Sequence, residues 1–163
     1  MSEQQEIILG EFHCTLDARY RVSVPGELSR LLKAPTPQCT LAKERPGCIS
    51  LWNSQVWQQK VDVRVDLAKQ KVQAGMHDDN ISHVQLLGRL LSTRHENVEL
   101  DAKDRLLIPK SFREFLGAAP GKEGNGLMVV GAAICVEIWQ PDAWIEYLRR
   151  RMPSFRKLVN KLA

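Results

Sequence analysis

The chain has 163 residues, of which 44% are hydrophobic and 26% charged, and its formal net charge is +4. This balance is typical of a folded globular protein and argues against extended disorder. No apolar run approaches the roughly 18 residues that a membrane span needs, and the first residues carry acids rather than the basic start of a signal peptide. We therefore expect a cytoplasmic protein without a membrane partner.

The first part of the chain predicts a hairpin followed by a short helix. Residues 7–16 and 21–24 alternate apolar and polar side chains, as strands do, and residues 17–20 break the pattern between them. Pro25 ends the second strand, because proline cannot donate to a strand ladder. Residues 27–33 then place leucines at helical spacing, which predicts a short amphipathic helix.

The middle of the chain continues with strands and helices separated by proline and glycine signals. The expected order is a strand at 38–42, a turn at 43–47, a strand at 48–52, a helix from residue 53 or 54 to about residue 74, a short helix at 79–86 and a strand from about residue 87. The second part repeats this order. It predicts strands at 96–100 and 105–108 around a turn at 101–104, a helix at 109–116, a glycine-rich loop at 117–126, strands at 127–130 and 134–139 joined at residue 131, a helix from residue 141 and a short helix after residue 153.

The two halves are copies of each other. LDARYRVSVPGELSRLL at 16–32 matches LDAKDRLLIPKSFREFL at 100–116, and CISLWNSQVW at 48–57 matches CVEIWQPDAW at 135–144. Two blocks in the same order indicate a tandem duplication. Each copy is too small to bury much apolar surface alone, so the repeats should pack together or interlace. We place the first repeat at 7–75, a linker with the start of the second repeat at 76–95, the second repeat at 96–152 and a basic tail at 153–163.

The turn inside each hairpin repeats the pattern Asp-Ala-cation-x-Arg. The aspartate can accept backbone N–H bonds in an Asx turn, and the spacing of two places both cations on one face, which suits phosphates. Alternatively, the aspartate and arginine of each turn only form an ion pair that stabilises the hairpin. We favour binding, because an exposed pair contributes about 0–1 kcal/mol and gives no reason for a second cation. The residues are Asp17, Arg19 and Arg21 in the first repeat and Asp101, Lys103 and Arg105 in the second.

Basic residues also collect toward the end of the chain. After Glu146 every charged side chain is basic: Arg149, Arg150, Arg151, Arg156, Lys157 and Lys161. Such a distribution suits an anionic partner, and nucleic acid is the commonest one.

Catalytic and metal-binding patterns are missing from the sequence. It contains no G-x-S-x-G, H-E-x-x-H or P-loop, so we expect no enzyme, cofactor, metal or small-molecule substrate. Cys48 and Cys135 occupy matching apolar positions and are interpreted as core residues rather than ligands or a disulfide. The four tryptophans could stack on bases, but their place at strand-to-helix corners favours the core. The cluster at residues 77–79 is interpreted as a solvated loop.

The doubled motif resembles the MraZ family, bacterial transcriptional regulators of the division and cell wall gene cluster that are related to AbrB-type swapped-hairpin proteins. The resemblance rests on L-D-x-x-x-R followed by [IV]-P, a short helix, a strand ending in Trp and a helix with a second Trp, and it covers about residues 8–148. It implies an α+β fold in which two tandem repeats interlace into a swapped-hairpin β-barrel with flanking helices. It also implies ring-shaped homo-oligomers that bind short repeats of double-stranded promoter DNA at the nucleoid. The implied DNA-binding residues are Arg19, Arg21, Lys103 and Arg105.

One departure from the family pattern keeps a second interpretation open. The family usually has glycine before the motif arginine, where the turn needs a positive φ, and this chain has Tyr20 and Asp104. The alternative is a structural or protein-interaction ring that has lost specific DNA binding. An AbrB-like antitoxin is a third possibility, which the two complete repeats disfavour because antitoxins of that type tend to carry one motif and a disordered tail.

Overall fold

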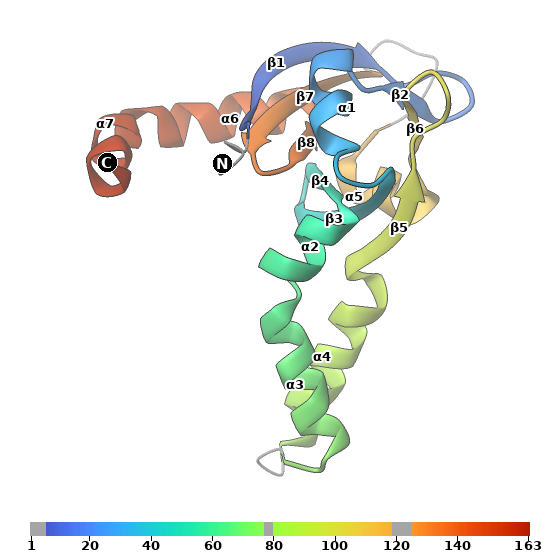
Figure 1. The fold of residues 1–163 in the computed structure, drawn as a ribbon, viewed down its shortest axis with the longest axis vertical. Coiled ribbons are helices and arrows are strands. Elements are labelled where there is room, and N and C mark those ends of the chain that lie inside the picture. Colours follow the sequence, from blue (N-terminus) through green and yellow to red (C-terminus); the bar gives the residue numbers. More distant parts are fainter. Residues whose placement is uncertain (1–5, 77–79, 119–124) are drawn as a thin grey trace.

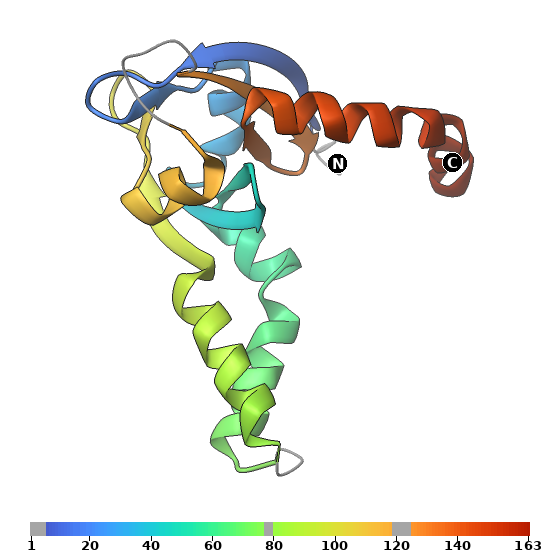
Figure 2. The same cartoon turned by 180° about the vertical axis from the view of Figure 1, so that it is seen from behind.

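The computed structural model describes residues 6–76, 80–118 and 125–163. A small body of strands and short helices carries two helical projections (Figures 1 and 2). The first projection consists of α3 (Val63–Gln73) and α4 (Ile81–Arg94). The second, which we call the arm, consists of α6 (Pro141–Arg151), a 3₁₀ turn (Met152–Ser154) and α7 (Phe155–Leu162). In the described part of the chain, no helix has both the length and the apolar character needed to cross a membrane.

Six strands form one antiparallel sheet in which the repeats interlace. Their order is β1 (Ile8–Thr15), β7 (Gly126–Ala133), β8 (Val136–Trp139), β4 (Cys48–Asn53), β3 (Gln38–Arg45) and β5 (His95–Glu99). The pairs β1–β7, β4–β8 and β3–β5 each join one strand from each repeat. Neither repeat could build this sheet alone, so the expected interlacing is confirmed.

The return strands of the two hairpins form a separate two-stranded ribbon. β2 (Arg21–Ser23) pairs antiparallel with β6 (Arg105–Leu107), and Val22 lies opposite Leu106 at the centre. The α+β class is therefore confirmed. The described strands make an open sheet and a ribbon, and no pairing among them closes a barrel, which differs from the expectation.

Equivalent backbone bonds extend the ribbon at both ends. The N–H of Val24 donates to the carbonyl of Asp104, and the N–H of Ile108 donates to the carbonyl of Tyr20, both at 2.9 Å. These four residues occupy matching positions in the duplicated blocks. The ribbon therefore has an approximate two-fold symmetry that relates one repeat to the other.

A short helix follows each hairpin and closes the core. α1 (Gly26–Leu32) and α5 (Lys110–Leu116) each begin directly after a proline, as expected. They bury large side chains at matching positions in one cluster with the strands, namely Leu28, Leu32, Phe112 and Leu116. Each such burial stabilises the fold by about 1.5–3 kcal/mol, so the core depends on both repeats.

The tryptophans lie in two smaller clusters. Trp52 and Trp57 meet edge to face with ring centroids 5.7 Å apart, and Trp139 and Trp144 lie 5.2 Å apart. Trp144 is half-buried and the other three are buried, which confirms that they are core residues.

The two cysteines of the duplicated block lie in these same clusters. Cys135 packs beside the first tryptophan pair and Cys48 beside the second, and both thiols are free. Burial raises the pKa of each thiol well above its ordinary value, so both stay protonated. Their interpretation as small core residues is confirmed.

Two predictions about the middle of the chain were wrong. The long helix expected to end near residue 74 is split into α2 (Ser54–Lys60) and α3. Asp62 lies at the break, where its buried carboxylate pairs with Arg94 of α4 at 2.7 Å. The chain therefore bends where a buried charge meets its partner.

The short helix and strand expected at 79–86 and from residue 87 are instead the single helix α4, and the strand begins only at His95. Val84, Leu87 and Leu91 are half-buried at helical spacing, but a short apolar run such as 84–91 does not by itself distinguish a helix from a strand. Two predicted strand ends also differ from the structure. β3 extends to Arg45, into the turn predicted at 43–47, and β7 continues to Ala133, past the junction predicted at Gly131.

Candidate functional site

The turn of the first hairpin is built around the carboxylate of Asp17. Its Oδ1 accepts the backbone N–H of Arg19 at 2.8 Å and that of Arg21 at 2.9 Å, and its Oδ2 accepts Nε of Arg21 at 3.0 Å. These bonds make the Asx turn that the sequence predicts. They lower the pKa of Asp17, chiefly through the backbone N–H of Arg21, so the carboxylate stays charged at neutral pH.

The second hairpin repeats these bonds around Asp101. The backbone N–H groups of Lys103 and Arg105 each donate to Oδ1 at 2.9 Å, and Nε of Arg105 donates to Oδ2 at 2.7 Å. The backbone N–H of Arg105 is again the main cause that lowers the pKa of Asp101. Two turns with different side chains at their tips therefore share one geometry, because they share the aspartate.

Each motif arginine is oriented by its own turn and still reaches solvent. The side chain of Arg21 is 23% exposed and that of Arg105 is 29% exposed. The aspartate takes only Nε, and no other described residue accepts a bond from the terminal nitrogens. The ion-pair interpretation is thus correct but incomplete, because each guanidinium retains two NH₂ groups that can donate to an anion.

The ribbon directs both arginines to the same side. Val22 and Leu106 are fully buried, and successive side chains of a strand point to opposite faces. We call the outer side the ribbon face; it carries Arg21, Ser23, Arg105 and Leu107. The two arginines are diagonal neighbours across the strands, a separation of roughly 7–8 Å that long side chains can bridge.

The remaining two cations flank this face. Arg19 and Lys103 are exposed at the hairpin tips, which lie at opposite ends of the ribbon because its strands are antiparallel. Along the ribbon the order is Arg19, Arg21, Arg105, Lys103. Along the backbone of the ribbon the four predicted residues therefore follow one another in a row, with the two arginines on one face and a tip cation at each end.

The tips keep their left-handed backbone without glycine. Tyr20 has a φ of 64° and Asp104 a φ of 57°. A side chain in this region costs about 1–2 kcal/mol, because its Cβ approaches a neighbouring carbonyl. The positive φ expected at these positions is confirmed, and something must offset its cost.

Each tip residue is held by the helix of the other repeat. The guanidinium of Arg113 on α5 lies over the Tyr20 ring, 3.7 Å from its centroid. Ser29 of α1 donates to Oδ2 of Asp104 at 2.8 Å, and Nζ of Lys33 donates to Oδ1 at 2.6 Å. The bonds from Lys33 and then Ser29 lower the pKa of Asp104. These contacts join residues far apart in the sequence and are not predictable from it, although residues 29 and 113 occupy matching positions in the repeats.

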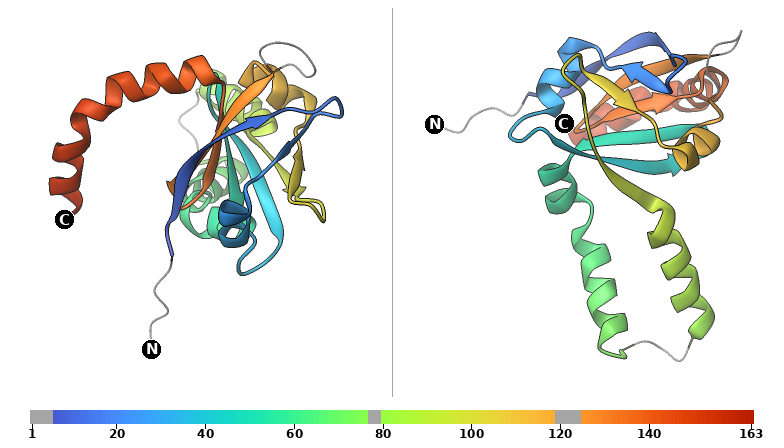
Figure 3. Two further views of the ribbon diagram at one scale, coloured as in Figure 1. Left: turned by 90° about the horizontal axis from the view of Figure 1, so that it is seen from above. Right: turned by 90° about the vertical axis from the view of Figure 1, so that its right-hand side faces the viewer.

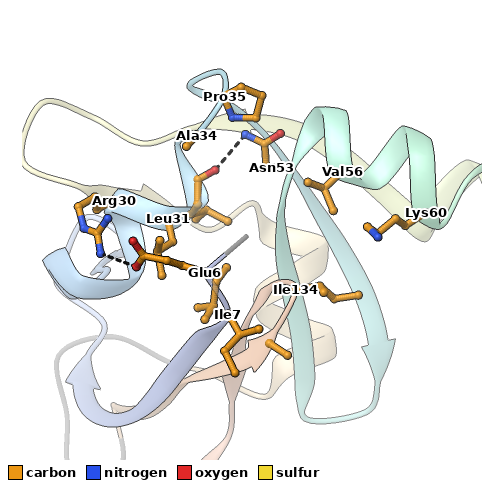
Figure 4. Close-up of a pocket in the computed structure, with 13 residues that line it drawn as sticks. Glu6, Ile7, Arg30, Leu31, Ala34, Pro35, Asn53, Val56, Lys60 and Ile134 are labelled. Carbon is orange, nitrogen blue, oxygen red and sulfur yellow. Dashed lines mark hydrogen bonds and ion pairs between the residues drawn. The ribbon is translucent and has the colours of Figure 1, made fainter. Parts of the chain in front are cut away.

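A groove of about 440 Å³ lies elsewhere on the body (Figure 4). It is bounded by the start of β1, by α1 and α2, and by the turn after β7, and its lining is mostly apolar. An exposed ion pair between Glu6 and Arg30 lies at its edge, with Nη2 and Oε2 3.1 Å apart. Among the residues that the structure describes, no three His, Cys, Asp or Glu side chains are placed to hold a metal ion, and residues 77–79 lie outside that part.

Comparison with known proteins finds similarity to one group of bacterial proteins. A family model described as "MraZ protein, putative antitoxin-like" matches residues 92–162, which contain the second hairpin and the arm. The Transcriptional regulator MraZ of Moorella thermoacetica is 25% identical over 156 residues, which are 96% of each chain. The MraZ regulator of Cytophaga hutchinsonii is 29% identical over 153 residues, which cover 93% of this chain and 91% of the relative. The MraZ regulator of Heliobacterium modesticaldum is 23% identical over 156 residues, which cover 96% of each chain. The chain is thus similar to the MraZ family model over residues 92–162 and to these MraZ regulators over nearly its whole length.

Proposed function

We propose that this protein is a DNA-binding transcriptional regulator that contacts short promoter repeats through the ribbon face. The observation that carries the proposal is the row of four cations, to which each repeat contributes a tip cation and an oriented arginine. Its relatives are named transcriptional regulators, which supports the same activity here. A regulator of this kind would work in the cytoplasm, at the nucleoid.

The geometry of the ribbon suits a DNA duplex. The free NH₂ groups of the two arginines can donate charge-assisted bonds to phosphate oxygens, which fix the register of a protein on DNA. The major groove also admits a two-stranded ribbon, so side chains of the ribbon face can reach base edges. The aspartates keep both guanidinium groups in place before DNA arrives, which reduces the ordering cost of binding.

A single subunit offers few contacts, so the proposal includes a ring-shaped homo-oligomer that presents several ribbon faces to repeated sites. Linked sites raise the overall affinity through effective concentration rather than through new contacts. The crossed strand pairs and the β2–β6 ribbon also support the swapped-hairpin arrangement that the resemblance implies.

The alternative, a ring that has lost specific DNA binding, rested on the missing glycines. Tyr20 and Asp104 nevertheless adopt the positive φ that the turn needs, and both tips keep the same hydrogen bonds. The structure gives this alternative no separate support, and we retain DNA binding as the function.

The test is fluorescence anisotropy with a duplex that carries the upstream region of the protein's own gene. Reversing both charges in Arg21→Glu/Arg105→Glu should abolish binding while the mass of the native particle stays the same. Arg64→Glu is the matched control, because Arg64 is an exposed arginine on α3, remote from the ribbon. Binding by the double variant at wild-type affinity would contradict the proposal.

A further inference from the structure

The arm ends in a helix whose apolar side is uncovered. Phe155, Leu158, Val159 and Leu162 lie on one side of α7 and are 45–78% exposed, and every other residue of that helix is exposed as well. Isolated helices shorter than about 12–15 residues are marginal in water and depend on a packed face. With eight residues, α7 therefore needs a surface to pack against.

The body of the same chain does not supply that surface. α6 is anchored by Trp144 and Tyr147, which pack on Trp139 of β8. Beyond this anchor the arm runs away from the sheet and carries α7 clear of the body, as Figure 1 and the left view of Figure 3 show. The eleven residues of α6 alone span about 16 Å. The missing surface must belong to another molecule.

The groove of Figure 4 is a second uncovered apolar surface on the chain. Figure 4 shows Ile7 and Ile134 at its mouth, with Leu31 and Val56 facing the same space. Ile7 is 59% exposed and Ile134 is 48% exposed, although both side chains are fully apolar. Its volume of about 440 Å³ falls within the roughly 300–1,000 Å³ of pockets that enclose a ligand.

We propose that α7 of one copy packs its apolar face into this groove of a second copy. Donor and acceptor lie on different parts of the chain, so the contact is heterologous, and its repetition gives a ring when the rotation closes. The cations Arg156, Lys157 and Lys161 remain on the solvent side of the seated helix. The inference rests on the homo-oligomer proposed above and names the segment that joins its copies.

The area of this contact favours a closed assembly over an isolated pair. A two-turn helix covers less than the roughly 800 Å² per partner of a standard stable interface. In a head-to-tail ring, however, every copy uses both its arm and its groove, and closure makes the contacts reinforce one another. We therefore expect oligomers without a substantial population of dimers.

The test uses one exposed residue from each surface. Leu158→Asp places a charge on the arm, Ile134→Asp places one in the groove, and Leu90→Asp is the matched control on α4, where Leu90 is 58% exposed. Native mass spectrometry and light scattering should find the wild type and Leu90→Asp as oligomers and the other two variants as monomers. Mixing the two monomeric variants leaves one intact arm and one intact groove but no ring closure, so the mixture should stay largely monomeric. Circular dichroism spectra and thermal unfolding that match the wild type show that both variants are folded.

Other outcomes overturn the inference in distinguishable ways. A monomeric wild type would remove both the proposed ring and this contact. An oligomeric wild type whose Leu158→Asp or Ile134→Asp variant keeps its mass would refute the contact alone and leave the proposed function standing. Dissociation by Leu90→Asp would place the acceptor on α4 instead. Vesicle binding that Leu158→Asp abolishes without a change in mass would assign α7 to a lipid surface.

Discussion

The contact between Arg113 and Tyr20 makes the stability of the first hairpin tip predictable. Tyr20→Ala removes the ring, and with it a cation–π contact of about 0.5–2 kcal/mol, while its Cβ keeps the cost of the left-handed backbone. Tyr20→Gly loses the same contact but relieves about 1–2 kcal/mol of backbone cost. Its more flexible unfolded state takes back about 0.4–1 kcal/mol. The free energy of unfolding of Tyr20→Gly should therefore exceed that of Tyr20→Ala by about 0.5–1 kcal/mol.

Thermal unfolding can resolve this difference, because 1 kcal/mol corresponds to about 2–4 °C in a chain of this size. Tyr20→Val should be the least stable of the three, since a β-branched residue tolerates positive φ poorly. A Tyr20→Ala variant that is as stable as Tyr20→Gly, or more stable, would refute the left-handed backbone at this position.

A double-mutant cycle tests the role of Arg113 itself. Arg113 also donates Nη1 to the carbonyl of Ile108 at 2.7 Å, so Arg113→Ala alone removes two interactions. Repeating Arg113→Ala in the Tyr20→Ala background isolates the ring contact, for which we expect a coupling of about 0.5–2 kcal/mol. Additive effects would mean that α5 does not hold the tip.

Three further predictions follow from the turns, the base of α4 and the ribbon face. The folded-state pKa of Asp17 and Asp101 lies below the ordinary 3.8. The stabilising effect of the two carboxylates is therefore present above that pH and is lost as the pH falls through the folded pKa. On acidification below about pH 4, the Tm of Asp17→Asn/Asp101→Asn should consequently fall less than the Tm of the wild type. Asp62→Ala should cost about 2–4 kcal/mol in urea unfolding, because it leaves Arg94 without its buried partner, whereas Asp66→Ala at a 3.9 Å exposed pair should cost less than about 1 kcal/mol. Leu107 is 58% exposed on the ribbon face, where it can contact a thymine methyl group. Replacing thymine by uracil in the bound site should therefore lower the DNA affinity of the wild type and leave that of Leu107→Ala unchanged. Ser23→Ala, at the matching position of the first repeat, is the control.

The duplicated blocks were enough to predict most of the body. Asp17 and Asp101 act within four residues of themselves, so a local pattern specified both turns, and a proline before each short helix specified where it begins. The need to bury each repeat against the other predicted the interlaced strands. The repeat boundaries at 7–75, 76–95, 96–152 and 153–163 stay a prediction.

The features that were missed depend on contacts distant in sequence. The break before α3 coincides with an ion pair between Asp62 and Arg94, and the tips depend on helices of the opposite repeat. The apolar run at 84–91 fits a strand locally, whereas α4 forms as one continuous helix. The open sheet follows from pairings between strands that no single segment encodes.

The central claim is that both repeats present their arginines to one polyanion, and the salt dependence of DNA affinity measures this directly. Each phosphate contact adds about 0.9 to the slope of log K against log salt concentration. Arg21→Gln and Arg105→Gln should each lower the slope of the wild type, their effects should add in the double variant, and Arg64→Gln should leave it unchanged. An unchanged slope, or a change from only one of the two arginines, would contradict a shared cationic face.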